Sequence, residues 1–298
     1  MITAGLWIPL TIAAAFLQNL RSMLQKRLTG VLSVNGAAYA RFCYALPFAW
    51  IYLYLLAGWE SPPTTNVSFW IFCAVGSLGQ IFASACLLSA FTLRSFAVST
   101  ALSKTEVVQT ALLGLVVLHD QLAPQAVIGI GVSFIGVLLL GSGLTLRDLL
   151  RPGYGRTRGL TLGLLAGAGL AVSVVGFRGA ALALPEGSAL MRAGLVLAVA
   201  LTLQTLVMGA FLALREPGQL SRVAGAWRGG ALVGLCGAAA SVGWFTAMTL
   251  QTAALVRALG QVELLFALLV SGWVFRERIS ARELVGVGAL VFGIYLLL

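Results

Sequence analysis

Long apolar segments alternate with short polar turns along the whole chain. A helix needs about 20 residues to cross the hydrocarbon core of a bilayer, and the apolar segments have about this length. The pattern predicts ten transmembrane helices, at residues 5–27, 34–57, 68–92, 96–118, 123–143, 159–182, 188–214, 229–250, 253–275 and 281–298. The predicted fold class is therefore an all-α integral membrane protein.

The composition agrees with a membrane protein. Hydrophobic residues make up 60% of the 298 residues and charged residues 9%, whereas about a quarter of an ordinary soluble domain is charged. The net charge of +10 comes mostly from cations in the short loops, where they set orientation and meet anionic lipid. The sequence has no basic stripes with interleaved aromatic residues, which argues against a nucleic-acid partner.

An internal repeat divides the chain. A gap-free offset of 157 residues places Glu106 on Glu263 and Asp120 on Glu277. It also aligns three glycines of the fifth span with three of the tenth: Gly129 with Gly286, Gly131 with Gly288, and Gly136 with Gly293. We therefore predict a duplicated five-helix unit, with a first repeat at 1–145, a central loop at 146–158 and a second repeat at 159–298.

Since each repeat has an odd number of spans, the second repeat should enter the membrane inverted relative to the first. The loop charges agree with this inversion. The loop after the second span has no Lys or Arg, while its counterpart after the seventh span carries Arg215, Arg222 and Arg228. Under the positive-inside rule, the bias over all loops predicts that both termini lie outside the cell.

Two predicted spans carry charged side chains, and those of the fourth span lie near its middle. Lys104 and Glu106 lie in the fourth span. Arg257 and Glu263 lie in the ninth. A charge at mid-membrane costs roughly 2.5–3.5 kcal/mol even on the lenient insertion scale, so these side chains should face the bundle interior or a watery cavity. Further polar side chains accompany them on the same two spans: Ser103, Gln109 and Gln261.

Two interpretations of these charges stay open. In the first they line a substrate pathway, with carboxylates for a substrate amine or a coupling proton and cations for a substrate carboxylate. In the second they are structural pairs, Glu106 with Arg257 or Glu263 with Lys104, that lock the repeats together. We assign the charged and polar residues of both spans to the pathway, with four further candidates: Arg41, Arg192, Ser84 and Trp244. Snorkelling of the arginines to the headgroups and packing of the Trp side chain are the structural alternatives.

Three shared features link the two halves to a known family. Each half has an Arg near the start of its second helix and an acid after its fourth: Arg41 and Arg192, Asp120 and Glu277. A Gly-rich fifth helix follows in each, "IGIGVSFIG" and "VGVGALVFG". In these features the whole chain resembles the drug/metabolite transporter superfamily, and its halves resemble EamA-like units. The resemblance implies ten helices around a central cavity and transport of a small metabolite, often outward.

Two features depart from the pattern of that superfamily. Its members commonly have both termini in the cytoplasm, against the charge bias found here. Many also have a proline in the middle of the fourth and ninth helices, where this chain has "SKTEVV" and "GQVELL". The substrate therefore does not follow from the resemblance.

We predict a secondary active transporter that moves small polar or amphipathic metabolites by alternating access, with amino-acid-like compounds and export favoured. A flippase for a lipid-linked head group and a non-transporting membrane receptor or scaffold are the alternatives. An enzyme is not predicted, because the single histidine, His119, lies in a loop and excludes His-based metal sites and a Ser–His dyad within the membrane. There is also no phosphate-binding loop for ATP.

No cofactor or metal is expected. The expected partners are a small-molecule substrate and membrane lipid, with a coupling proton as a further candidate. The sequence leaves a monomer and a homodimer open. The expected location is the cell inner membrane, as a multi-pass protein.

Overall fold

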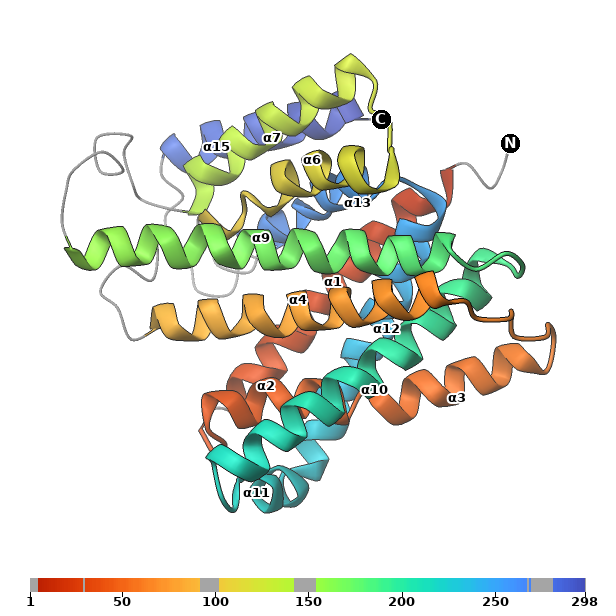
Figure 1. Ribbon diagram of the computed structural model, residues 1–298. Helices are drawn as coiled ribbons and strands as arrows, with labels where there is room; N and C mark the ends of the chain where they lie inside the picture. The colour runs from red at the N-terminus through yellow and green to blue at the C-terminus, as the bar shows by residue number, and fades with distance from the viewer. Residues whose placement is uncertain are drawn as a thin grey trace. The chain divides into compact units, whose positions relative to one another are not determined.

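A computed structural model describes residues 5–28, 30–91, 102–141, 154–266, 268 and 281–297. Within these ranges the chain consists of helices joined by turns and short irregular segments, with no β-strand, which confirms the predicted all-α class. The helices are α1 (Trp7–Leu28), α2 (Val34–Cys43), α3 (Leu46–Ala57), α4 (Val67–Phe91), α6 (Glu106–Leu118), α7 (Pro124–Gly141), α9 (Tyr154–Leu182), α10 (Ala189–Arg215), α11 (Gln219–Gly225), α12 (Trp227–Leu250), α13 (Ala253–Gly260) and α15 (Ala281–Leu297) (Figure 1).

The chain forms two compact units. The first unit comprises residues 1–81 and 176–251, and the second comprises residues 82–175 and 252–298. Each unit therefore takes helices from both halves of the sequence. The units do not coincide with the predicted repeats, whose bounds stay a prediction.

The first unit is built around α10. This helix packs against α2, α3 and α12, and α1 packs along α12. Phe42, Leu197 and Met208 belong to its main apolar cluster. The end of α9 also lies close to α4, because a Cβ atom at Gly176 would come within 2.8 Å of the Cα atom of Gly76. Close approach through small residues is the usual way in which membrane helices gain contact with one another.

The predicted span 34–57 consists of two helices rather than one. α2 ends at Cys43 and α3 begins at Leu46, with Pro47 in its first turn. A proline has no N–H to donate to the preceding turn, and its ring crowds the carbonyl four residues back. Around the second span the repeats align with an offset of 151, which pairs Arg41 with Arg192 and Pro47 with Ala198. The counterpart helix α10 therefore has Ala198 in place of the proline and runs without interruption for 27 residues. The two halves therefore differ at this point.

In the second unit, α7 and α15 pack against each other through glycines. A Cβ atom at Gly129 would lie 2.8 Å from the carbonyl oxygen of Gly293, and one at Gly136 would lie 2.8 Å from that of Gly286. The order of these pairs shows that the two helices run antiparallel. Because Gly129 is equivalent to Gly286 and Gly136 to Gly293, the two helices meet through equivalent surfaces.

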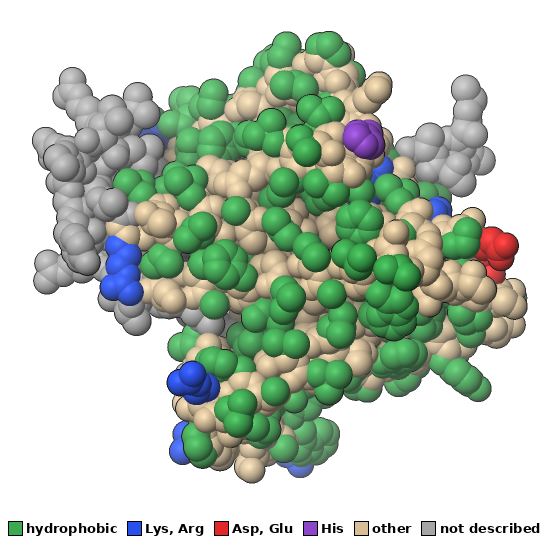
Figure 2. Space-filling view, viewed as in Figure 1, with side chains coloured by type: hydrophobic (Ala, Val, Ile, Leu, Met, Phe, Trp, Pro, Cys, Tyr) green, Lys and Arg blue, Asp and Glu red, His purple; other side chains and the backbone are tan. Residues whose placement is uncertain are grey.

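The helices expose many apolar side chains. Tyr54, Val116 and Leu214 are 79%, 71% and 81% exposed, and hydrophobic side chains cover most of the face drawn in Figure 2. So large an apolar surface is unfavourable in water and favourable in lipid. Among the described residues, five helical segments are long and apolar enough to cross a membrane: Val34–Ala57, Val67–Leu87, Arg158–Leu182, Ala189–Arg215 and Trp227–Leu250.

The helix bounds differ from the predicted spans in detail. α9 begins at Tyr154, inside the segment predicted as the central loop. The loop predicted after the seventh span contains the short helix α11. The described part of every predicted span is mainly helical, while the count of ten crossings, their inversion and the orientation of the termini stay predictions. Glu277, the predicted counterpart of Asp120, lies outside the described residues.

Candidate functional site

The charged residues of the second unit lie where two helices are interrupted. Residues 102–103 are helical, Lys104 and Thr105 form a turn, and α6 begins at Glu106. At this turn the Thr105 N–H donates to the Leu102 carbonyl at 3.0 Å, a three-residue spacing typical of a 3₁₀ turn. The span predicted at 96–118 is therefore not one continuous α-helix in its described part.

The second interruption falls at the equivalent position of the other repeat. α13 ends at Gly260, Gln261 forms a turn, and residues 262–266 are helical again. The Gln261 N–H donates to the Ala258 carbonyl at 3.2 Å, again over three residues. The offset of 157 places Lys104 on Gln261, so the two breaks correspond. Such breaks within helices often mark functional hinges.

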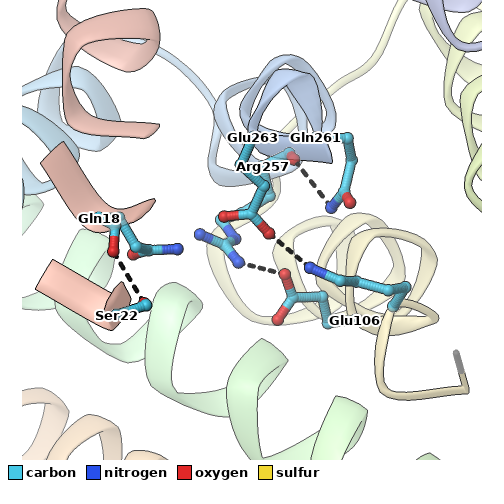
Figure 3. Close-up of polar contacts among 7 residues, drawn as sticks. Gln18, Ser22, Glu106, Arg257, Gln261 and Glu263 are labelled. Atoms are coloured by element: carbon cyan, nitrogen blue, oxygen red, sulfur yellow. Dashed lines mark hydrogen bonds and ion pairs between the residues drawn. The ribbon is translucent and has the colours of Figure 1, made fainter. Parts of the chain in front are cut away.

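Two crossed ion pairs join the interrupted helices. Lys104 Nζ lies 2.5 Å from Glu263 Oε1. Arg257 pairs through Nη2 with Glu106 Oε1 (Figure 3). Each pair connects one half of the sequence to the other. The sequence offered these pairs as alternatives, and the structure forms both.

The two pairs differ in burial. The side chains of Arg257 and Glu106 are 14% and 2% exposed, while those of Lys104 and Glu263 are 20% and 13% exposed. Two cations face two anions, so the group has no net formal charge. Removing one partner from a buried pair leaves an uncompensated charge in a medium of low dielectric constant. The Arg257–Glu106 pair is therefore the more sensitive of the two.

Polar side chains surround the turn at Lys104 and Thr105. Gln109 Nε2 donates to Thr105 Oγ1 at 2.8 Å and lies 3.4 Å from the Leu164 carbonyl of α9. Gly167 of α9 leaves room for this contact, since a Cβ atom there would come within 2.8 Å of Thr105 Oγ1. Ser103 is buried on the same segment. These contacts position the predicted residue Gln109 beside the turn, and Ser103 directly precedes Lys104 in the chain.

Three buried oxygen atoms near the ion pairs have hydrogen-bonding capacity that the described residues do not use. They are Glu106 Oε2, Gln261 Oε1 and Thr110 Oγ1. Gln261 is held through its amide nitrogen, which lies 3.4 Å from the Arg257 carbonyl. Buried polar atoms normally have a partner, so these oxygens can accept a hydrogen bond from a group that enters the site.

The other predicted site residues do not belong to this group. Arg41, Arg192 and Trp244 lie in the first unit, and Ser84 lies on α4 in the second. Arg192 is in the first turn of α10, while Trp244 is buried within α12. Arg41 lines a separate cavity of the first unit. The structure therefore brings together Lys104 and its neighbours, Glu106, Gln109, Ser103, Arg257, Gln261 and Glu263.

Two buried polar side chains of the first unit were not predicted as site residues. Arg178, near the end of a span, donates through Nη1 to the Met248 carbonyl at 2.5 Å and also to the Gln251 carbonyl. It therefore binds the carbonyl end of α12, where a cation is favourable. Gln204 is 1% exposed and donates from Nε2 to Gln80 Oε1 at 2.6 Å. A single amide within the apolar run of α10 was the only sequence signal for this contact.

The helices expose apolar side chains that suit lipid, and the charges inside the second unit are compensated by ion pairs. These two features define a multi-pass membrane protein with a polar interior. The EamA-like transporter family matches residues 5–142 and 157–298. The chain belongs to this family, and thus to the drug/metabolite transporter superfamily, as the features shared by its two halves predicted. It is a membrane transporter of small molecules, from a family of transporters rather than enzymes.

The fold also has a counterpart among solved structures. A crystal structure of a protein matches with a TM-score of 0.72 and 16% sequence identity, over 97% of this chain and 95% of that chain. At this identity the likeness shows a shared fold and no more. No curated protein matches the sequence closely enough to add a named relative.

Proposed function

We propose that the chain is a secondary active transporter that exports small polar or amphipathic metabolites, amino-acid-like compounds above all, across the inner membrane. It works by alternating access between two inverted five-helix repeats that together cross the membrane ten times. The family match supports transport of small molecules. The antiparallel packing of α7 and α15 through equivalent glycines supports the inversion.

The crossed ion pairs at the two helix interruptions carry the proposal for the site. An entering ammonium group competes with Arg257 for Glu106, whose Oε2 is a buried acceptor with unused capacity. A carboxylate on the same substrate competes with Glu263 for Lys104. A zwitterion suits the group best, because it exchanges partners at both pairs without adding net charge.

This mechanism unites the two interpretations of the charges. With both pairs closed, they lock the two interrupted helices of the second unit together. When substrate replaces one partner of a pair, the lock opens and the helices can move at their 3₁₀ turns. A proton taken up by Glu106 releases Arg257 in the same way. The substrate shifts the equilibrium between two conformations only by its difference in affinity for them, which the exchange of ion-pair partners supplies.

The test compares metabolites released by cells that express the wild type, the Glu106→Gln/Glu263→Gln double variant, or no transporter. Glu186→Gln serves as the control, since it removes an acid at an exposed position between α9 and α10. Membrane abundance is matched by quantifying the protein in isolated membranes. We expect one class of compound to leave faster with the wild type and the control than with the double variant or empty cells.

The other outcomes separate the parts of the proposal. If the double variant releases the same compounds at the wild-type rate, export stands and the site assignment is wrong. If the wild type matches empty cells, export of soluble metabolites is wrong, and import or lipid flipping becomes the leading hypothesis.

A further inference from the structure

The first unit contains a small cavity that is lined entirely by residues of that unit. Side chains from α1, α2, α4, α10 and α12 line it, and its polar lining consists of Arg21, Arg41, Gln80, Gln204 and Ser241. About 40 Å³ is open to the centres of water-sized molecules. A single water needs roughly 10–15 Å³ in this measure, so the cavity has room for about three waters or for one small polar group.

The cavity is electropositive. Two guanidinium groups line it, and none of its described lining residues is Asp or Glu. Arg41 stacks over the Phe42 ring, with its guanidinium carbon 4.4 Å from the ring centroid. This contact compensates only part of the cost of a cation inside a membrane protein. An anion bound between Arg21 and Arg41 would be attracted to both positive charges.

Local residues adapt the cavity to these arginines. Gly237 of α12 leaves space for Arg21, since a Cβ atom there would lie 3.2 Å from Arg21 Cδ. The hydrogen bond from Gln204 Nε2 to Gln80 Oε1 fixes two amides in the wall. The polar lining is therefore held in place by contacts from several helices, as a binding site for a small group requires.

We propose that this cavity is a second carboxylate site for a transported small molecule, in addition to the site proposed at Lys104. The planar, multidentate guanidinium matches a carboxylate in geometry as well as charge, and the cavity volume fits such a group rather than a whole large metabolite. The inference rests on the proposed transport function and narrows its substrates to compounds that carry a carboxylate. Because Arg21 and Arg41 belong to different helices, bound carboxylate would hold α1 to α2.

The test measures thermal unfolding of the purified full-length protein in detergent micelles, with sodium propionate or its neutral analogue propionamide at equal ionic strength. We expect propionate to raise the unfolding midpoint in a saturable way, because a ligand that binds only the folded state stabilises it, and propionamide to leave it unchanged. Arg41→Gln should weaken the apparent affinity for propionate by about tenfold or more. Arg222→Gln, the same change at an exposed position, should keep the wild-type response.

If propionate and propionamide change the unfolding midpoint of the wild type equally, the proposal is overturned, whatever the variants show. The proposal is also overturned if propionate raises the unfolding midpoint of Arg41→Gln as it does for the wild type, since the anion would then bind elsewhere. If Arg41→Gln does not fold, Arg41→Lys replaces it: the charge stays, the planar fork is lost, and the proposal expects weaker binding of propionate.

This experiment is independent of transport. If propionate stabilises the protein through Arg41 while cells release no compound, the transport proposal fails and the carboxylate site stands. If cells release only compounds without a carboxylate and propionate has no effect, the transport proposal stands and the carboxylate site fails.

Discussion

Removing the charge of Glu106 is the sharpest test of the charged group. The Glu106→Gln substitution keeps the size of the side chain but deprives Arg257 of the carboxylate with which it pairs. Lys104 and Glu263 stay as they are. The substitution changes a balanced group of four charges into one with an excess positive charge.

The burial of the two pairs sets the expected magnitude. Breaking a buried ion pair costs about 3–5 kcal/mol, whereas an exposed pair contributes about 0.2–1 kcal/mol. With side-chain exposures of 2% and 14%, the Glu106–Arg257 pair lies near the buried limit. The Glu263–Lys104 pair is more exposed, at 13% and 20%. We therefore expect Glu106→Gln to lower the free energy of unfolding by about 3–5 kcal/mol, and Glu263→Gln to lower it by less.

The assay is reversible unfolding of the purified protein in mixed micelles, driven by increasing fractions of sodium dodecyl sulfate. A double-mutant cycle with Arg257→Gln should give a coupling energy near the upper end of the usual range of about 0.5–3 kcal/mol. Glu186→Gln, at an exposed position, should stay within about 0.5 kcal/mol of the wild type. The reasoning is refuted if Glu263→Gln is the more destabilising change, or if the effects of Glu106→Gln and Arg257→Gln simply add.

The same unfolding assay checks two further contacts. Gly136→Ala should destabilise the protein by about 1–3 kcal/mol, because the new Cβ atom would lie 2.6 Å from the Leu290 nitrogen. Gly131→Ala on the same helix is the control, since its Cβ atom meets nothing within 4 Å and should not destabilise the protein. Equal effects of the two substitutions would contradict the close packing of α7 and α15. Arg178→Met should cost about 1–3 kcal/mol, because it leaves buried carbonyls at the end of α12 without their donor; an unchanged stability would show that these bonds do not hold α12.

The positions of the helices could be predicted from the sequence, since long apolar runs leave few alternatives. Their interruptions were harder to predict. Pro47 does signal a break, but the apolar run continues across it, and the length of that run predicts one span. The turn at Lys104 and Thr105 has no proline, and its geometry accompanies ion pairs with residues more than 150 positions away. A local pattern does not contain that information.

The candidate site also depends on long-range contacts that a local sequence pattern does not contain. The cost of a charge in the membrane was enough to offer Glu106 with Arg257, or Glu263 with Lys104, as structural pairs beside the pathway interpretation, because each charge needs an opposite one at a similar depth. The cavity of the first unit gave no such signal. Arg21 and Arg41 come together through the packing of α1 and α2 with α12. The sequence offers Arg41 alone as a pathway candidate, with snorkelling to the headgroups as the alternative, and it does not predict Arg21 as its neighbour.

The pairing of charges across the two halves also constrains how the protein is made. Glu106 is synthesised 151 residues before Arg257. At roughly 5–20 residues per second, that interval lasts roughly 8–30 s. During this time the nascent first half carries Lys104 and Glu106 without the partners they have in the finished fold. The charges of the first half thus gain their partners only after synthesis of the second, and a chain that stops early keeps Lys104 and Glu106 without the partners of the finished fold.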